Sequence, residues 1–133
     1  MKKINYQLFS KTIWAFFIIF LIGSKSSLGQ RPISSDTLIR KSLKVNEGFE
    51  LKFLDCPGAG YGWSLSAPYD STLLTIRQKS SELAEGNHPI GGHYVRTYYY
   101  KVLNKKNITL VYYYQRPWLQ DKVHKCKILI RVK

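Results

Sequence analysis

Segments in which every second residue is apolar make up most of the chain beyond residue 37. In residues 126–132, for example, Cys, Ile, Ile and Val alternate with Lys, Leu and Arg, and residues 49–54 follow the same period of two. Successive side chains of a β-strand point to opposite faces, so this pattern predicts half-buried strands and not amphipathic helices. We predict strands at 38–45, 49–54, 63–66, 73–79, 93–102, 108–115 and 126–132.

Turn-forming residues separate the predicted strands. Three of the separators are Asn46-Glu47-Gly48, Ala67-Pro68-Tyr69-Asp70 and Asn104-Lys105-Lys106-Asn107. Seven short strands in about 100 residues, bounded by such turns, are typical of an all-β, immunoglobulin-like antiparallel β-sandwich. The one helical feature that we expect is a single turn at residues 80–85.

The first 29 residues differ in composition from the rest. Three lysines precede an apolar run at residues 13–23, and small and polar residues follow it as far as Gly29. This order is typical of a secretory signal peptide, so we predict a signal at 1–29 and one domain at 30–133. The apolar run is about half of the ~20 residues that a membrane span needs. We therefore expect a secreted or periplasmic protein with no stable membrane anchor in its mature form.

The chain is strongly basic, with 21 Lys and Arg against 8 Asp and Glu. Such a balance favours nucleic acid, anionic lipid or an acidic protein as partner. The basic residues are scattered along the sequence and do not form one block, as shown by Lys41, Lys52, Lys79, Lys105, Lys125 and Arg131. The predicted export argues against nucleic acid. We therefore expect a solvated surface that contributes some electrostatic steering.

Two cysteines follow the predicted signal, Cys56 and Cys126. Disulfides persist in an exported protein, and a bridge between these two requires their Cα atoms to lie within roughly 7 Å. Cys56 ends a predicted strand, and Cys126 has an inward position in the last one. Either they form one disulfide or both remain small buried thiols.

The residues that usually carry catalysis or bind metals do not form a pattern. His88, His93 and His124 show no metal-ligand spacing with one another or with either cysteine. A cysteine and a histidine alone lack the orienting residue and the deep pocket that a nucleophile pair needs. We therefore expect no enzyme activity, no metal and no cofactor.

The order of the strands places three unusual connections at one end. When successive strands of a sandwich run up and down, every second connection emerges at the same end. The connections at 55–62, 80–92 and 115–121 should therefore share one rim, whereas the turns at the other end are short. This asymmetry is typical of a rigid scaffold whose loops carry the function.

Two of these connections suit binding in different ways. Arg116-Pro117-Trp118 closes a tyrosine-rich strand, and arginine and tryptophan are the side chains that most often anchor protein interfaces. Residues 57–60 are Pro-Gly-Ala-Gly, so this backbone is slim enough to enter a narrow cleft. An alternative for Trp118 is that its indole folds back over the end of the sandwich.

The first of these connections resembles that of the chagasin-like inhibitors of papain-type cysteine peptidases, inhibitor family I42. In that family the loop usually reads Asn-Pro-Thr-Thr-Gly-Tyr-x-Trp. Here Pro57, Gly60, Tyr61 and Trp63 agree with it. Cys56 replaces the asparagine, and glycine and alanine replace the two threonines, so groups that order the family's loop are absent.

The second and third connections continue the resemblance in the same order and spacing. The family's second loop is glycine-rich ahead of an aromatic strand, as Gly91-Gly92 is here, and its third reads Arg-Pro-Trp, as residues 116–118 do. An acidic residue often follows that tryptophan in the family, whereas this chain has Leu119. The resemblance covers nearly all of the chain after the predicted signal.

The resemblance implies a reversible, non-covalent inhibitor that blocks the cleft of a papain-type cysteine peptidase. The backbone of Gly58 and Ala59 would lie over the catalytic cysteine of the enzyme. Arg116, Pro117 and Trp118 would pack on the primed side and the Gly91-Gly92 segment over the unprimed side, with a monomer binding one enzyme. The implied contact residues are Pro57, Gly58, Ala59, Gly60, Tyr61, Gly91, Gly92, Arg116, Pro117 and Trp118.

Two other functions remain open at this stage. An exported binding module of the same fold would recognise a carbohydrate or a surface protein through its many tyrosines, although aromatic residues also favour strands for packing alone. A basic protein bound to a membrane surface is the third alternative.

Overall fold

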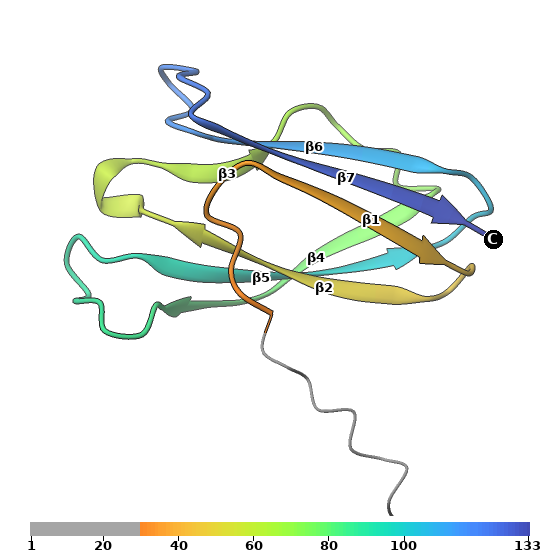
Figure 1. Ribbon diagram of the computed structural model, residues 1–133, viewed down its shortest axis with the longest axis horizontal. Coiled ribbons are helices and arrows are strands. Elements are labelled where there is room, and N and C mark those ends of the chain that lie inside the picture. The colour runs from red at the N-terminus through yellow and green to blue at the C-terminus, as the bar shows by residue number, and fades with distance from the viewer. Residues whose placement is uncertain (1–29) are drawn as a thin grey trace, which may run out of the picture.

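The computed structural model describes residues 30–133, which form a two-layer β-sandwich (Figure 1). The predicted signal at 1–29 lies outside the described residues. One sheet has the strand order β1-β7-β6-β3 and the other β2-β5-β4. The strands are β1 (Thr37–Leu43), β2 (Gly48–Asp55), β3 (Gly62–Leu65), β4 (Leu74–Leu83), β5 (Tyr94–Val102), β6 (Ile108–Gln115) and β7 (His124–Val132). The predicted sandwich and its strands are confirmed, with ends that differ by a few residues.

Pairing within the sheets is antiparallel except between the first and the last strand. β1 pairs with β7 in parallel, from Thr37 opposite Cys126 to Leu43 opposite Val132. Because successive strands reverse direction, the first and the seventh run the same way, and they lie side by side in one sheet. The chain moves to the other sheet at the turn between β1 and β2.

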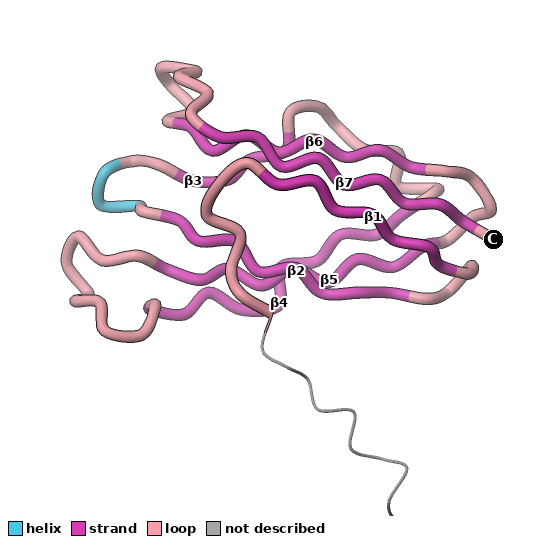
Figure 2. Tube along the Cα trace, viewed as in Figure 1, coloured by secondary structure: helices cyan, strands magenta, loops and turns pink. Residues whose placement is uncertain are grey.

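The helical turn expected at 80–85 is wrong. β4 continues to Leu83, which pairs with Tyr94 of β5, and a register shift between Gln78 and Ser80 leaves Lys79 as an extra residue. A bulge of this kind lets a strand bend and still form its ladder of hydrogen bonds, which outweighs local helix preference. The structure instead has one 3₁₀ turn at Pro57–Ala59, cyan in Figure 2. No helix within residues 30–133 is long and apolar enough to cross a membrane.

The core lies between the two sheets and consists of the inward residues of each strand. β7 shows the pattern most clearly, because Cys126, Ile128 and Ile130 are buried while their neighbours are exposed or half-buried. Aromatic rings from both layers meet near Phe53, whose ring centroid is 4.9 Å from that of Tyr112. The alternation of apolar and polar residues in the sequence therefore corresponds to the alternation of core and surface positions along the strands.

The two cysteines do not form the possible disulfide. Both are free thiols in the described part of the chain. Cys126 is fully buried in the four-stranded sheet, whereas Cys56 follows β2 and pairs with Tyr61 at the start of a loop. Burial raises the pKa of the Cys126 thiol to about 11, so it behaves as a small apolar core residue.

A hydrogen bond between two buried tyrosines links the sheets. The hydroxyls of Tyr100 on β5 and Tyr112 on β6 lie 2.8 Å apart. Burial raises the pKa of both groups, that of Tyr112 to about 12. Each hydroxyl is the partner that keeps the other from being buried without a hydrogen bond.

We expect Tyr112→Phe to lower the free energy of unfolding by about 1–2 kcal/mol, because it leaves the Tyr100 hydroxyl unpaired in the core. The double variant Tyr100→Phe/Tyr112→Phe should recover most of that loss, since no hydroxyl then remains buried. Urea denaturation of the three proteins measures both effects. Losses that simply add in the double variant would contradict this account.

Candidate functional site

Three loops meet at one end of the sandwich, on the left in Figures 1 and 2. They are the β2–β3 loop (56–61), the β4–β5 loop (84–93) and the β6–β7 loop (116–123), which we call together the loop rim. The prediction that these connections share one end is confirmed. The second begins at 84 instead of 80 because β4 is longer than expected.

The β2–β3 loop occupies the middle of the loop rim and contacts the β4–β5 loop through bare backbone. A Cβ atom added to Gly58 would lie 2.8 Å from the Cα atom of Gly91. Gly91 itself has a φ of 72°, which favours glycine. The two loops are therefore packed backbone to backbone, and any side chain at position 58 would separate them.

Gly60 supports the loop on the other side. It ends the 3₁₀ turn with a φ of 79° and donates its N–H to the carbonyl oxygen of Pro57 at 2.9 Å. A Cβ atom at Gly60 would lie 2.3 Å from Cη2 of Trp118, so the indole edge lies directly on this glycine. Trp118 nevertheless keeps 69% of its surface exposed. The indole therefore contacts the central loop without folding away into the sandwich.

Asp121 holds the β6–β7 loop in its shape. Its carboxylate accepts hydrogen bonds from the backbone N–H of Arg116 at 2.9 Å, from the Arg116 guanidinium at 2.7 and 2.9 Å, and from the Tyr61 hydroxyl at 2.8 Å. The hydrogen bonds from the Arg116 backbone and side chain lower the pKa of Asp121 to about 2. The Arg116 guanidinium also lies 4.8 Å from the centre of the Tyr61 ring. Asp121 thus joins two loops of the rim, and Arg116 has an internal partner.

A partly buried ion pair lies beneath the loop rim. Asp55 is 3% exposed and pairs with Arg96 of β5. Its second oxygen accepts the N–H of Trp63 at 2.7 Å, and the Arg96 guanidinium donates to the Trp63 carbonyl at 2.9 Å. Because Trp63 belongs to the other sheet, this group fixes the two ends of the β2–β3 loop relative to each other.

The residues implied by the resemblance do not all face outward. Gly60, Tyr61 and Arg116 are half-buried, and Gly92 is buried, where a Cβ atom would lie 2.0 Å from the carbonyl oxygen of His88. Gly92 is therefore a turn residue inside its loop. The exposed members are Pro57, Gly58, Ala59, Gly91, Pro117 and Trp118.

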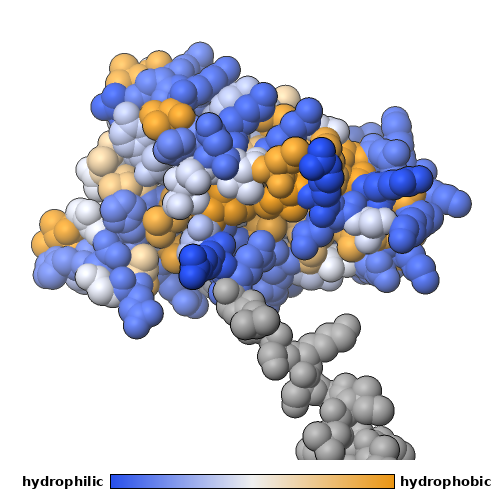
Figure 3. All heavy atoms as spheres, viewed as in Figure 1, coloured by the Kyte–Doolittle hydropathy of each residue, from blue (hydrophilic) through white to orange (hydrophobic). Residues whose placement is uncertain are grey.

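Three residues of the loop rim were missed by the sequence reasoning. Ile90 is 86% exposed and Leu119 is 56% exposed, and Figure 3 shows hydrophobic surface at the tips of their loops. Both are apolar residues within turns, outside any alternating segment, and that position is the signal that was available. Asp121 is the third, and its only sequence signal is a lone acid at the end of the loop that Arg116 opens.

The loop rim is a projecting surface and not a reaction site. An open groove of about 460 Å³ runs beneath it, with Tyr61, Tyr94 and Trp118 among its walls. Within residues 30–133, no group of three or more His, Cys, Asp or Glu is placed to hold a metal ion. Exposed apolar tips around a side-chain-poor centre suit contact with another protein.

The fold agrees with three solved structures that are distant in sequence. The crystal structure of the cysteine protease inhibitor EhICP2 from Entamoeba histolytica is 18% identical, with a TM-score of 0.57 over 74% of this chain and 88% of that one. PbICP-C, solved in complex with falcipain-2, is 19% identical, with a TM-score of 0.56 over 80% and 96%. Amebosin is 14% identical, with a TM-score of 0.52 over 75% and 100%. At these identities the likeness establishes the fold.

The sandwich and its loop rim are those of a binding protein. A match in sequence identifies its family. Residues 42–132 match the family described as chagasin family peptidase inhibitor I42. Since this match spans most of the chain, the protein belongs to the chagasin family. It is a peptidase inhibitor and not an enzyme. A comparison with curated proteins gives no significant match.

We expect the shape of the β6–β7 loop to persist in acid. The pKa of Asp121 in the folded protein, about 2, is below its ordinary value of 3.8, so its contribution to stability is present above 3.8 and lost as pH falls through about 2. In an NMR titration, the Arg116 amide shift should stay nearly constant from pH 7 to about pH 3. A midpoint near 3.8 would contradict this. Asp121→Asn is the control, because its Arg116 amide should be displaced already at pH 7.

Proposed function

We propose that this chagasin-family protein inhibits papain-type cysteine peptidases reversibly, by laying the loop rim across the active-site cleft. The β2–β3 loop enters the cleft, with Gly58 and Ala59 over the catalytic cysteine. The β4–β5 and β6–β7 loops contact the walls on either side. Export of the domain at 30–133 after removal of the signal at 1–29 is part of the proposal.

The observation that carries the proposal is the double contact of the central loop. Gly58 is packed against Gly91 on one side, and Gly60 against the indole of Trp118 on the other. The slim loop is therefore supported by both neighbours before any enzyme binds. Pre-ordered binding loops lose little conformational entropy on association, which favours affinity.

The backbone conformation of the central loop explains how it would inhibit a peptidase without being cleaved. Pro57, Gly58 and Ala59 are exposed and form a 3₁₀ turn, whereas a peptidase substrate binds in an extended form. A closed turn presents no extended peptide bond to the catalytic thiolate. The contact is steric, so the peptidase is blocked without a covalent bond.

The flanking loops supply apolar contact area. Ile90 and Trp118 are the two most exposed large hydrophobic residues in the described part of the chain, at 86% and 69%. They lie on the loops on either side of the central one, where contact with the walls of a cleft would cover them. The complex of PbICP-C with falcipain-2 supports a peptidase as the partner of this fold.

Titration of papain tests the proposal directly. The protein should abolish hydrolysis of a small fluorogenic substrate saturably and competitively. Ala59→Trp, which widens the tip of the central loop, should fold normally and lose inhibition by at least about a hundredfold, since the cleft has no room for the indole. Lys105→Trp at the opposite end is the matched control and should inhibit normally. Normal inhibition by Ala59→Trp would remove the central loop from the site, and inertness toward papain and several cathepsins would refute the function.

The two exposed apolar anchors have separable effects. Trp118→Ala should weaken inhibition by about thirtyfold, equivalent to about 2 kcal/mol, and Ile90→Ala by about tenfold, if both side chains are covered by the enzyme. Leu38→Ala is the control, because Leu38 is 49% exposed but lies on β1, away from the loop rim. Inhibition constants equal to that of the control would exclude the corresponding loop from the contact.

A further inference from the structure

The four-stranded sheet carries positive charge with no acidic residue in any of its strands. β1, β3, β6 and β7 contain neither Asp nor Glu, whereas the other sheet contains Glu50, Asp55 and Glu82. Five exposed cations occupy the outward positions of β1 and β7 and the C-terminus. We call them the basic face: Arg40, Lys125, Lys127, Arg131 and Lys133.

These charges have no ion-pair partner among residues 30–133. The four ion pairs of the described chain involve Lys79, Arg96, Arg116 and His124. Lys125 lies instead 6.0 Å from the centre of the Tyr113 ring, and Lys122 lies 4.5 Å from it. Asp36 lies beside the first of these cations, where it accepts the backbone N–H of Lys125 at 2.7 Å and pairs with His124. The charged groups of the basic face therefore remain available to an outside anion.

The cations of β7 form a line. Lys125, Lys127 and Arg131 lie at alternate positions of β7, and Lys133 follows the strand in the same alternation, so neighbouring positions are separated by roughly 6.6 Å. Leu129 occupies the position between the two pairs. A row of this kind matches the repeat of a linear polyanion better than a single anionic group.

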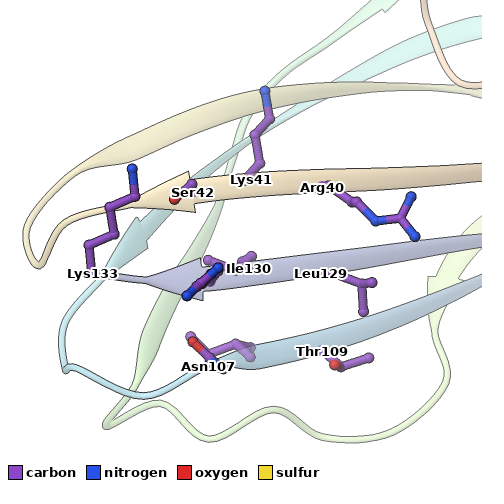
Figure 4. A pocket seen from close by; sticks show the side chains of 10 residues that line it. Arg40, Lys41, Ser42, Asn107, Thr109, Leu129, Ile130 and Lys133 are labelled. Atoms are coloured by element: carbon purple, nitrogen blue, oxygen red, sulfur yellow. The ribbon is translucent and has the colours of Figure 1, made fainter.

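A shallow depression of about 590 Å³ interrupts this row (Figure 4). Arg40, Leu129 and Thr109 form one line across β1, β7 and β6, as their pairing requires. Ser42 and Asn107 also line it, next to Arg131. The depression thus combines two guanidinium groups and two lysines with hydroxyls, an amide and three apolar residues, of which Leu129 lies in line with Arg40 and Thr109.

We propose that the basic face binds a linear acidic polysaccharide that carries sulfate or carboxylate groups. The row of cations pairs with the charged groups along the polymer. Ser42, Asn107 and Thr109 supply the donors and acceptors that sugar hydroxyls need, and Leu129 and Tyr113 supply apolar surface for the faces of the rings. A hollow suits a chain that lies in it, whereas a bilayer surface favours several projecting apolar side chains, and Leu38 is the exposed large apolar residue of β1 and β7.

Binding at the basic face leaves the loop rim open. The loops lie at the end of the sandwich and the basic face along its side (Figure 1). The two surfaces can therefore be occupied together, so that an acidic polysaccharide would retain the protein while the loops remain available. This function is independent of peptidase inhibition.

The test compares two variants of equal net charge. Arg40→Gln/Lys127→Gln/Arg131→Gln removes three cations from the basic face, and Lys52→Gln/Arg77→Gln/Lys101→Gln removes three from strands of the other sheet. Binding of a fluorescent heparin oligosaccharide is measured at about 0.15 M NaCl, where long-range effects of net charge are screened. The first variant should bind at least about tenfold more weakly than the parent protein and the second less than about threefold.

Each other outcome overturns the proposal. Equal weakening of heparin binding in both variants would mean that net charge alone explains the binding. A parent protein that does not bind heparin would refute the proposal. Binding to phosphatidylserine vesicles or to single-stranded DNA that is tighter than heparin binding and is lost in the first variant would assign the face to another polyanion. Thermal unfolding of both variants serves as the folding control. Papain inhibition by the first variant should equal that of the parent, which separates this result from the function of the loop rim.

Discussion

The ion pair between the buried carboxylate of Asp55 and the half-buried Arg96 is the interaction on which the binding end of this protein depends. The Asp55 carboxylate is buried and the Arg96 side chain half-buried, and both partners also hydrogen-bond to the backbone of Trp63 in the opposite sheet. Removing Arg96 would leave the buried Asp55 carboxylate without its ion-pair partner, which is far more costly than losing a surface ion pair. The β2–β3 loop begins at one member of this group and ends at another. The contacts of Asp55, Arg96 and Trp63 therefore fix the position of this loop between its neighbours.

The loops themselves are shaped as much by their neighbours as by their own sequence. Gly58 and Gly60 resemble a flexible segment when read alone, because glycine permits many backbone conformations. In the fold each glycine marks a place where another loop approaches too closely for a side chain. Asp121 of the flanking β6–β7 loop also accepts a hydrogen bond from the Tyr61 hydroxyl of the central loop. The rim is thus a single packed unit made of three connections that are distant in the chain.

The fold and much of the candidate site were predictable, and the exceptions have a common cause. Alternation predicted the seven strands because it is a local property of side-chain direction. The prediction of a helical turn at 80–85 was wrong because long-range pairing with β5 extends β4 through a bulge. Gly92 and Arg116 lie on loops of the rim, yet contacts with His88 and Asp121 give them internal roles. Ile90 is recognised as a candidate contact residue only from its exposure in the fold.

The sequence by itself determined the class of fold, the order of the three unusual loops and the family, because strand periodicity and short motifs are encoded by neighbouring residues. Tertiary structure alone decided that the two cysteines remain apart, that glycines form the contacts between loops, and that the cations of β1 and β7 share a sheet whose strands contain no acidic residue. These features depend on which strands become neighbours. Residues such as Arg40 and Arg131 are far apart in the chain, and only the parallel pairing of β1 with β7 brings them to the same face.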